Sequence, residues 1–522
     1  MTESVLSSVL AYTKRPLAII LAIGLAIRLI LAPIFTFNID VAYWVKITEI
    51  IGSGFGLYDV TGYYYTPVWG YVVAVFSVLG ELLGITDIAT VVPEFAPYLS
   101  SDYPLLPYVV SPAYAFMMKL PIILADTAVA FMIYSLVKDV TSDNRKAICA
   151  FALWYLCPLV IIESSVHGMF DCFSAMVTLA TIMIVRKGNY FLAGAAFSVA
   201  VLTKFFPVFL IFFLVAYVLK KEGLNLRGTK KVFASVAGAF VALFIIQSPA
   251  ILRGQFWESL FYLTDRIGIS TGTLNSISNL KTLAVLLVVF AIMVAIIVYL
   301  NRKGEKGRLD RIAAMDPKVR DRKVVQALVR IGIVLTLLVI LYSVYSVITS
   351  DFEDILEIFS GVGMKFVMIL SIYTLLIEFY LAYRLLYADS LDSRTTYTIL
   401  FLSSVVIFLW PPLPQYVVVS VPFMVLYCVI VNDKLTKPFL AFASLTTLYE
   451  CILGNVTALF PISVYWGVIP LDAIMPIVGF LAGSVFGIPV VGFFVSVFAA
   501  VAFVSLLALL WHWYKADKEV LF

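Results

Sequence analysis

The sequence has little charge. Only 13% of its 522 residues are Asp, Glu, Lys or Arg, and 62% are hydrophobic, whereas roughly a quarter of an ordinary soluble domain is charged. The mean hydropathy is +1.04, and the apolar residues form many separate runs close to the roughly 20 residues that cross a bilayer as a helix. These features exclude a soluble domain and indicate an all-α, polytopic membrane protein.

Histidine is rare, and motifs for nucleotides are missing. The chain has two histidines, His167 and His512, which excludes a site built from several histidines. It contains no phosphate-binding glycine loop and no GxGxxG motif after a strand, so we expect no nucleotide-binding domain. Its five cysteines form no CxxC pair. The formal charge of +4, without a basic cluster among aromatics, excludes a nucleic-acid partner.

Basic residues recur at every second expected crossing, as they do in loops on the cytoplasmic side. Residues 35–111 hold one lysine and no arginine, so we expect them to form the first external loop, with a helix over residues 67–84 against the outer interface. Residues 301–325 are rich in Lys and Arg and predict a cytoplasmic loop. The prediction is one transmembrane domain over residues 1–522, with about 12 to 15 spans.

Two short hairpins are expected between residues 147 and 221. The chain is expected to reach the outer side at His167, the cytoplasmic side at the basic pair 186–187, and the outer side again at Lys204, before it returns to the cytoplasmic side. Each limb has roughly 14–20 residues. Discontinuous helices at membrane depth are tolerated where they are buried in protein or line a cavity. We therefore expect His167, Asp171 and Lys204 to face an external cavity.

Polar side chains gather at the expected external ends of the helices. Asp40 follows the first span, where it either carries chemistry or caps a helix. The turn with Tyr64 and Tyr65 suits packing against a sugar ring, or belongs to an aromatic belt. Residues 163–171 hold two acids and a histidine, which favours function because such groups are costly to bury. Lys204 either binds a phosphate or extends to the interface.

Several short motifs match one known pattern. The strongest is Val166-His167-Gly168-Met169-Phe170-Asp171, followed at the expected distances by residues 187–194 and 202–207; residues 64–67, 119–126 and 414–416 match further motifs. Together they resemble the polytopic glycosyltransferases of the GT-C superfamily, particularly the PIG-M-like and family 87 mannosyltransferases. Two departures stand out: Asp40 has no second acid two residues on, and His167 stands where glutamine is common.

The resemblance implies a GT-C fold with a helical first external loop. It also implies transfer of a hexose, with mannose expected, from a polyprenyl- or dolichyl-phosphate donor to a lipid-linked glycan or glycolipid. The expected setting is the outer face of a prokaryotic cell membrane, archaea included, with inversion at the anomeric carbon. Because no nucleotide domain is expected, an activated sugar must arrive on a membrane lipid.

The resemblance also implies roles for individual residues. Asp40 stands at the place of the family's catalytic acid and is expected to act as the base. Lys204 and Arg266 are expected at the donor phosphate. The residues expected to contact the sugar or the acceptor are Tyr64, Tyr65, His167, Asp171 and Gln415. No cofactor is expected, and because Asp40 is a lone acid, the sequence does not indicate a divalent metal.

The alternative reading is a polytopic transporter or lipid flippase. Such a protein needs related halves and polar residues at mid-membrane depth in several spans. Here the polar residues concentrate at one face, and only Asp126, Glu378 and Arg384 are expected deeper. The motif at residues 119–126 gives Asp126 a scaffold role.

Overall fold

The computed structural model describes residues 2–59, 63, 65–93, 108–256, 259, 315–349, 362–408, 413–485 and 488–521. Over these ranges the chain is built from helices, with two short antiparallel strand pairs as the exception. The predicted all-helical class is confirmed. The following elements are those that position the polar residues.

Five described helices are long and apolar enough to cross a membrane, or up to seven if two bent pairs each count as one span. This is the pattern of a multi-pass membrane protein, and the larger predicted number of spans stays a prediction. The five are α1 (Thr2–Ile34), α4 (Pro112–Thr141), α10 (Leu226–Leu252), α16 (Val362–Leu386) and α23 (Val490–Asp517). The bent pairs are α5 (Asn144–Tyr155) with α6 (Pro158–Ile162) and η2 (Glu163–His167), and α20 (Thr436–Gly454) with α21 (Phe460–Val464).

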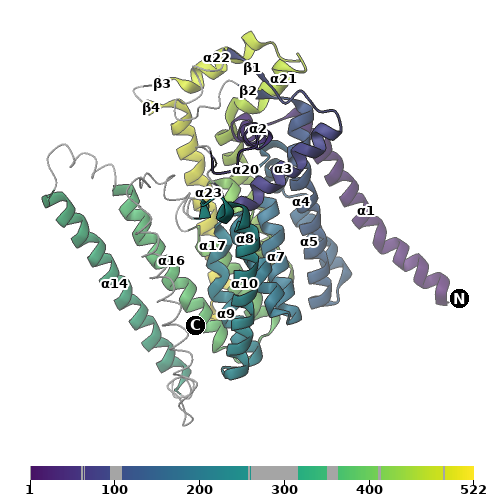
Figure 1. Cartoon of the computed structure of the whole chain (residues 1–522). Helices are drawn as coiled ribbons and strands as arrows, with labels where there is room; N and C mark the ends of the chain where they lie inside the picture. Colours follow the sequence, from purple (N-terminus) through teal and green to yellow (C-terminus); the bar gives the residue numbers. More distant parts are fainter. Residues whose placement is uncertain are drawn as a thin grey trace.

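The two predicted hairpins are present as helices α7 (Asp171–Lys187), α8 (Tyr190–Thr203) and α9 (Ile211–Glu222), which run beside α10 (Figure 1). Gly188 ends α7 with φ +84°, a conformation that favours glycine. Helices α8 and α10 touch backbone to backbone, because a Cβ placed on Gly194 would lie 1.7 Å from the carbonyl oxygen of Ser235. Small residues therefore let these limbs pack closely.

The remaining helices surround this group. Helices α14 (Pro317–Thr349) and α16 stand to one side of it in Figure 1. Residues 301–314 of the predicted cytoplasmic loop lie outside the described residues, and the remainder of that loop overlaps the start of α14. The core also contains α17 (Ser393–Val406), α18 (Pro414–Val417) and α19 (Val421–Ile430).

The predicted first external loop is helical in its described part. It contains α2 (Asn38–Gly52), α3 (Pro67–Leu82) and the antiparallel strands β1 (Ala89–Val91) and β2 (Tyr108–Val110). A helix at residues 67–82 agrees with the prediction for that run, while its position at a membrane interface stays a prediction.

A late segment of the chain covers the first external loop. Val92 and Val109 pack against Phe460, Ile474 and Val478 in one small apolar cluster. These residues bring α21 and α22 (Leu471–Ala482) to the same end of the molecule as α2, β1 and β2, at the top of Figure 1. The strands β3 (Ser484–Val485) and β4 (Ile488–Pro489) follow α22 and lead into α23. Two regions far apart in sequence thus share this end.

Candidate functional site

A short π-helix, η2, carries the central histidine. Its wider turn closes through the Gly168 N–H, which donates to the Glu163 carbonyl at 3.0 Å. Gly168 then ends it at φ +78°, and a Cβ there would meet the Val41 side chain at 2.9 Å. The Trp44 indole donates to the Gly168 carbonyl at 3.2 Å. Isolated π turns are rare and occur frequently at functional sites, and this one is locked by contacts to α2.

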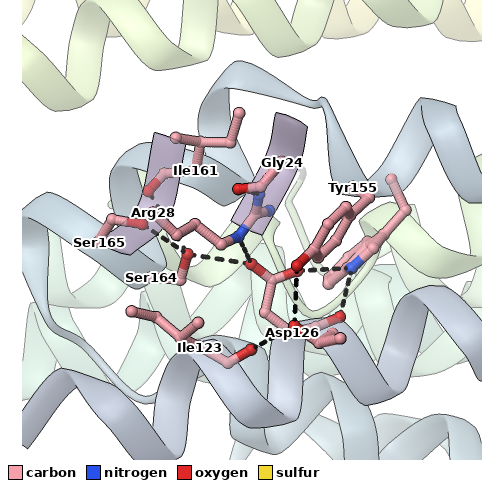
Figure 2. A network of polar contacts seen from close by, with 10 residues as sticks. Gly24, Arg28, Ile123, Asp126, Tyr155, Ile161, Ser164 and Ser165 are labelled. Carbon is pink, nitrogen blue, oxygen red and sulfur yellow. Dashed lines mark hydrogen bonds and ion pairs between the residues drawn. The ribbon is translucent and has the colours of Figure 1, made fainter. Parts of the chain in front are cut away.

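A fully buried ion pair anchors η2 to the first span and to α4. Arg28 donates to Asp126 Oδ2 at 2.5 Å, and the Ser164 hydroxyl donates to the same oxygen at 3.0 Å (Figure 2). The Trp154 indole donates to Asp126 Oδ1 at 2.8 Å. The Arg28 guanidinium also lies over the Tyr155 ring, 4.1 Å from its centroid. This network holds α1, α4, α5 and η2 in one arrangement.

Lys119 fixes the other end of the same contact between α1 and α4. It lies seven residues before Asp126, so both side chains project from the same face of α4. Its ammonium donates to the carbonyls of Ala32 at 2.9 Å and Phe35 at 2.6 Å, and to the Thr36 hydroxyl at 2.8 Å. A cation at the carboxyl end of α1 is favoured by the helix dipole. Lys119 thereby fixes the point from which the chain enters α2.

His167 lies among three carboxylates. Its Nε2 is 2.6 Å from Asp40 Oδ2, and its Nδ1 is 3.2 Å from Glu163 Oε2 and in ion-pair contact with Glu450 Oε1. The side chains of Glu163 and Glu450 are 0% exposed, whereas that of Asp40 is 33% exposed. Of the three acids around His167, only Asp40 is partly exposed, so the cluster is accessible from the surface at Asp40. The structure brings the predicted residues Asp40 and His167 into direct contact.

Glu450 was missed by the sequence analysis. It comes from α20, and Gly454 on the next turn of that helix lets the Phe37 ring approach, since a Cβ there would lie 2.4 Å from the ring. The Phe37 N–H in turn donates to the Val166 carbonyl at 3.1 Å. A sequence signal existed, because Glu450 is an acid within an apolar helix, and such residues are rare without a function.

The carboxylates of the cluster have few donors. Within the described ranges neither oxygen of Glu450 accepts a hydrogen bond, and neither does Glu163 Oε1. The contact from His167 to Glu450 is short but lacks hydrogen-bond geometry. Ligating atoms of Glu163, His167 and Glu450 all lie within 4.8 Å of one another, so these three residues could hold a metal ion.

Asp171 and Lys204 form a second buried pair. Lys204 Nζ lies 2.5 Å from both oxygens of Asp171, and it sits over the rings of Phe170 and Tyr416, at 5.1 and 4.4 Å from their centroids. Both side chains are buried, as is His167. The expectation that these three residues face an open external cavity is therefore not met, because the opposite charge and the rings enclose them.

Aromatic side chains connect the two polar groups. Trp69 stacks on Phe170 at 4.9 Å between centroids, and Tyr65 and Trp44 pack edge-on against Phe170 at 5.2 and 5.9 Å. Trp44 stands one turn after Asp40 on α2, and Phe170 directly precedes Asp171. The buried Trp69 indole N–H has no acceptor among the residues that the structure describes. The predicted Tyr65 thus lies close to both polar groups, while Tyr64 lies outside the described residues.

The last predicted residues fall in two places. Gln415 is buried in the first turn of α18, next to Tyr416, which covers Lys204. Its side-chain oxygen accepts no hydrogen bond in the described part of the chain. Arg266 lies outside the described residues, so its predicted place at a phosphate stays a prediction.

An apolar cavity of about 250 Å³ lies between α7, α8, α9 and α10. Its walls include Phe197, Leu214 and Phe240, and almost all of its lining is apolar. The α8 wall is formed by Ala193, Gly194 and Phe197, toward the start and middle of that helix rather than at its end before Lys204. An apolar space of this kind fits a hydrocarbon chain rather than a polar solute.

Asp59 shows an electrostatic effect outside the spans. The Gly56 N–H donates to it at 2.5 Å, the Gln255 amide donates to its other oxygen at 2.5 Å, and Arg253 forms an ion pair with it. The hydrogen bond from Gly56, with those from Gln255 and Arg253, holds the pKa of Asp59 below its usual value. This contact ties the turn around Asp59 to the end of α10, and Asp59 itself is no part of the His167 cluster.

Compared with known protein families, the sequence matches no family model, and a search among curated proteins finds no match. The case for a function therefore rests on the residues of the site and on the motifs in the sequence.

Proposed function

We propose that the chain is a membrane glycosyltransferase of the GT-C type that transfers a hexose, with mannose expected, from a polyprenyl- or dolichyl-phosphate donor. The acceptor is a lipid-linked glycan or glycolipid on the extracytoplasmic face, and Asp40 is the base. Sugar transfer requires a carboxylate that a substrate hydroxyl can reach, next to aromatic and cationic groups. The residues around His167 offer these groups.

The observation that carries the proposal is the contrast in exposure within the cluster. Asp40 is one-third exposed and held by His167, while Glu163 and Glu450 are fully buried. A base must come within hydrogen-bond distance of the proton that it removes, so Asp40 is the acid suited to meet an acceptor. His167 is then a positioning residue, because it contacts Asp40 and is itself enclosed.

The donor would lie on the other side of the aromatic cluster. An ammonium has three N–H donors, so Lys204 can bind a phosphate oxygen while it keeps its contact with Asp171. The apolar cavity beside α8 suits the isoprenoid chain, and the partly buried Tyr65 offers a ring face for a sugar, with the fully buried Trp69 behind it on Phe170. Arg266 is the second proposed phosphate ligand, and Gln415 a proposed contact to the sugar or acceptor.

The chemistry is a single displacement. Asp40 accepts the proton of the acceptor hydroxyl as its oxygen forms a bond to the anomeric carbon. The bond from that carbon to the phosphate oxygen breaks, and the lipid phosphate leaves with its charge stabilised by Lys204. Attack opposite the leaving group inverts the anomeric carbon. The proton ends on Asp40 and the leaving group is the lipid phosphate, so the step balances without a nucleotide.

The test is transfer by the purified chain from radiolabelled polyprenyl-phosphate-mannose to native membrane lipids. Asp40→Asn is expected to lose activity by about 10²–10⁴-fold, the usual contribution of a general base. Glu49→Gln is the matched control, because Glu49 is an exposed acid on the same helix and is expected to leave transfer unchanged.

Two results would overturn the proposal. Equal transfer by the parent and the Asp40→Asn variant would remove Asp40 as the base. Absence of transfer together with movement of a solute or lipid across vesicles containing the chain would favour a transporter or flippase.

A further inference from the structure

We propose that Glu163, His167 and Glu450 form a binding site for one divalent transition-metal ion. This inference does not rest on sugar transfer, because metal binding is measured without donor or acceptor. The three residues come from η2 and α20, two elements far apart in sequence that the fold places in contact.

The charge of the cluster supports a cation. Three carboxylates surround one imidazole, so even a protonated ring leaves an excess of negative charge. Isolated charges in a low-dielectric interior are costly unless they are paired or bind a metal. A divalent ion between Glu163 and Glu450 would balance both of their charges. The comparison with Asp171 is direct, because that buried acid has Lys204 as its own cation.

The carboxylate oxygens of Glu450 and Glu163 that accept no hydrogen bond also support a bound metal ion. Glu450 is fully buried, yet over the described ranges both of its oxygens lack a hydrogen-bond donor, and so does Glu163 Oε1. Buried carboxylates are normally satisfied by donors. A metal ion satisfies carboxylate oxygens without donating a proton, which explains both the burial and the lack of donors.

His167 has the environment of a metal-binding histidine. Its Nδ1 faces Glu163 and Glu450, while its Nε2 faces Asp40 at 2.6 Å. Metal-bound histidines almost always donate their other ring N–H to a carboxylate, carbonyl or water, and Asp40 stands in that place. Ligands of one ion lie about 3–4 Å apart, so the 4.8 Å limit of this cluster requires small side-chain movements.

The ligand types select the class of metal. An imidazole nitrogen with two carboxylates suits Zn²⁺ or Mn²⁺ better than Mg²⁺ or Ca²⁺, which prefer oxygen ligands alone. No described cysteine belongs to the group of ligand atoms that lie within 4.8 Å of one another, so thiolates do not enter the set.

The experiment uses the full chain in detergent, purified without a histidine tag and freed of metal with a chelator. After loading with Mn²⁺ and removal of excess, metal analysis is expected to give one ion per chain. Electron spin echo spectroscopy is expected to show nitrogen coupling from an imidazole. The chain has only two histidines, so this signal identifies its source: His512→Asn keeps it, and His167→Asn loses it.

Variants of the acids complete the test. Glu450→Gln is expected to weaken Mn²⁺ binding by at least tenfold, and Asp40→Asn by about 10–100-fold, as for a partner of a metal-bound histidine. Glu378→Gln is the matched control, because Glu378 is a buried acid on α16 outside the cluster, and it should bind as the parent does.

The proposal is overturned if the parent binds no ion after removal of excess Mn²⁺, or if nitrogen coupling survives in a folded His167→Asn variant. Should His167→Asn fail to fold, unchanged binding by Glu450→Gln overturns it equally. In these cases the cluster is an imidazole held by carboxylates alone.

Discussion

The molecule contains two buried polar clusters that share the η2 segment and differ in how their acids are satisfied. In the first, Asp126 accepts hydrogen bonds from Arg28, Trp154 and Ser164 (Figure 2). In the second, Glu450 contacts His167 but accepts no hydrogen bond from any residue in the described part of the chain. One carboxylate is surrounded by donors and the other lacks them.

The difference separates a structural role from a functional one. A buried carboxylate that accepts hydrogen bonds on both oxygens, as Asp126 does, stabilises one arrangement of helices, whereas one that accepts none is destabilising unless something else completes it. The Asp126 network has no exposed acid, and the His167 cluster reaches the surface through Asp40. The first cluster therefore fits a role in the scaffold, and the second is the one to which the proposed binding and catalysis belong.

The largest effect is expected from breaking the scaffold network. Asp126→Asn removes the charge that Arg28 faces, and an uncompensated buried charge costs about 3–5 kcal/mol. The variant is expected to lower the free energy of unfolding by about that amount, measured by unfolding in mixed detergent micelles.

Two further sets of variants, one in each cluster, serve as controls for this prediction. Replacing both partners with apolar residues, Arg28→Met with Asp126→Leu, should recover most of the loss, since no charge is then left alone. Glu450→Gln in metal-free protein should lower stability less than Asp126→Asn does, because His167 keeps Asp40 and Glu163 as partners and the Glu450 carboxylate accepts no hydrogen bond in the described structure. A loss as large as that of Asp126→Asn would erase the distinction between the clusters.

A smaller effect is expected at the junction of the two clusters. Gly168→Ala places a Cβ at φ +78° and 2.9 Å from the Val41 side chain, which should destabilise the chain by about 1–3 kcal/mol. Because Gly168 follows His167, the variant should also weaken Mn²⁺ binding, while Ser164 keeps its place beside Asp126. Unfolding and metal titration of the same preparation test both statements. A variant as stable as the parent would show that η2 is not constrained at its end.

The smallest effect is expected at Asp59, an accessible acid that serves as the reference for the buried ones. The pKa of Asp59 is lower in the folded chain than in the unfolded chain. The charged Asp59 therefore stabilises the fold at pH values above its unfolded pKa. This stabilisation is lost as the pH falls through its folded pKa. Asp59→Asn should therefore unfold at a slightly lower temperature than the parent at pH 7. That difference should shrink as the pH falls below the pKa of the unfolded chain and should vanish below the folded pKa, and a difference that grows on acidification would contradict this assignment.

The sequence predicted the parts of the fold that local patterns control. The basic pair at Arg186 and Lys187 and the turn at Lys204 mark the ends of α7 and α8, as expected. The resemblance led to Asp40 and His167, which lie in contact. The helix ends follow from hydropathy and charge, which are read over a few residues, while the roles proposed for Asp40 and His167 stay predictions.

The failures concern contacts between distant segments. Glu450 joins His167 only because α20 packs against α6, and periodicity carries no information about which helices are neighbours. The predicted open cavity around Lys204 failed for a related reason. Its partner Asp171 was identified from sequence, yet the rings of Phe170 and Tyr416 that enclose the pair come from separate elements.

The position of Glu450 along the chain has a consequence for biosynthesis. The ribosome delivers Asp40, Glu163 and His167 to the membrane long before α20 is made. Until that late helix is inserted, His167 lacks its contact with Glu450. The proposed metal site therefore predicts that a chain cut short before α20 retains no ion.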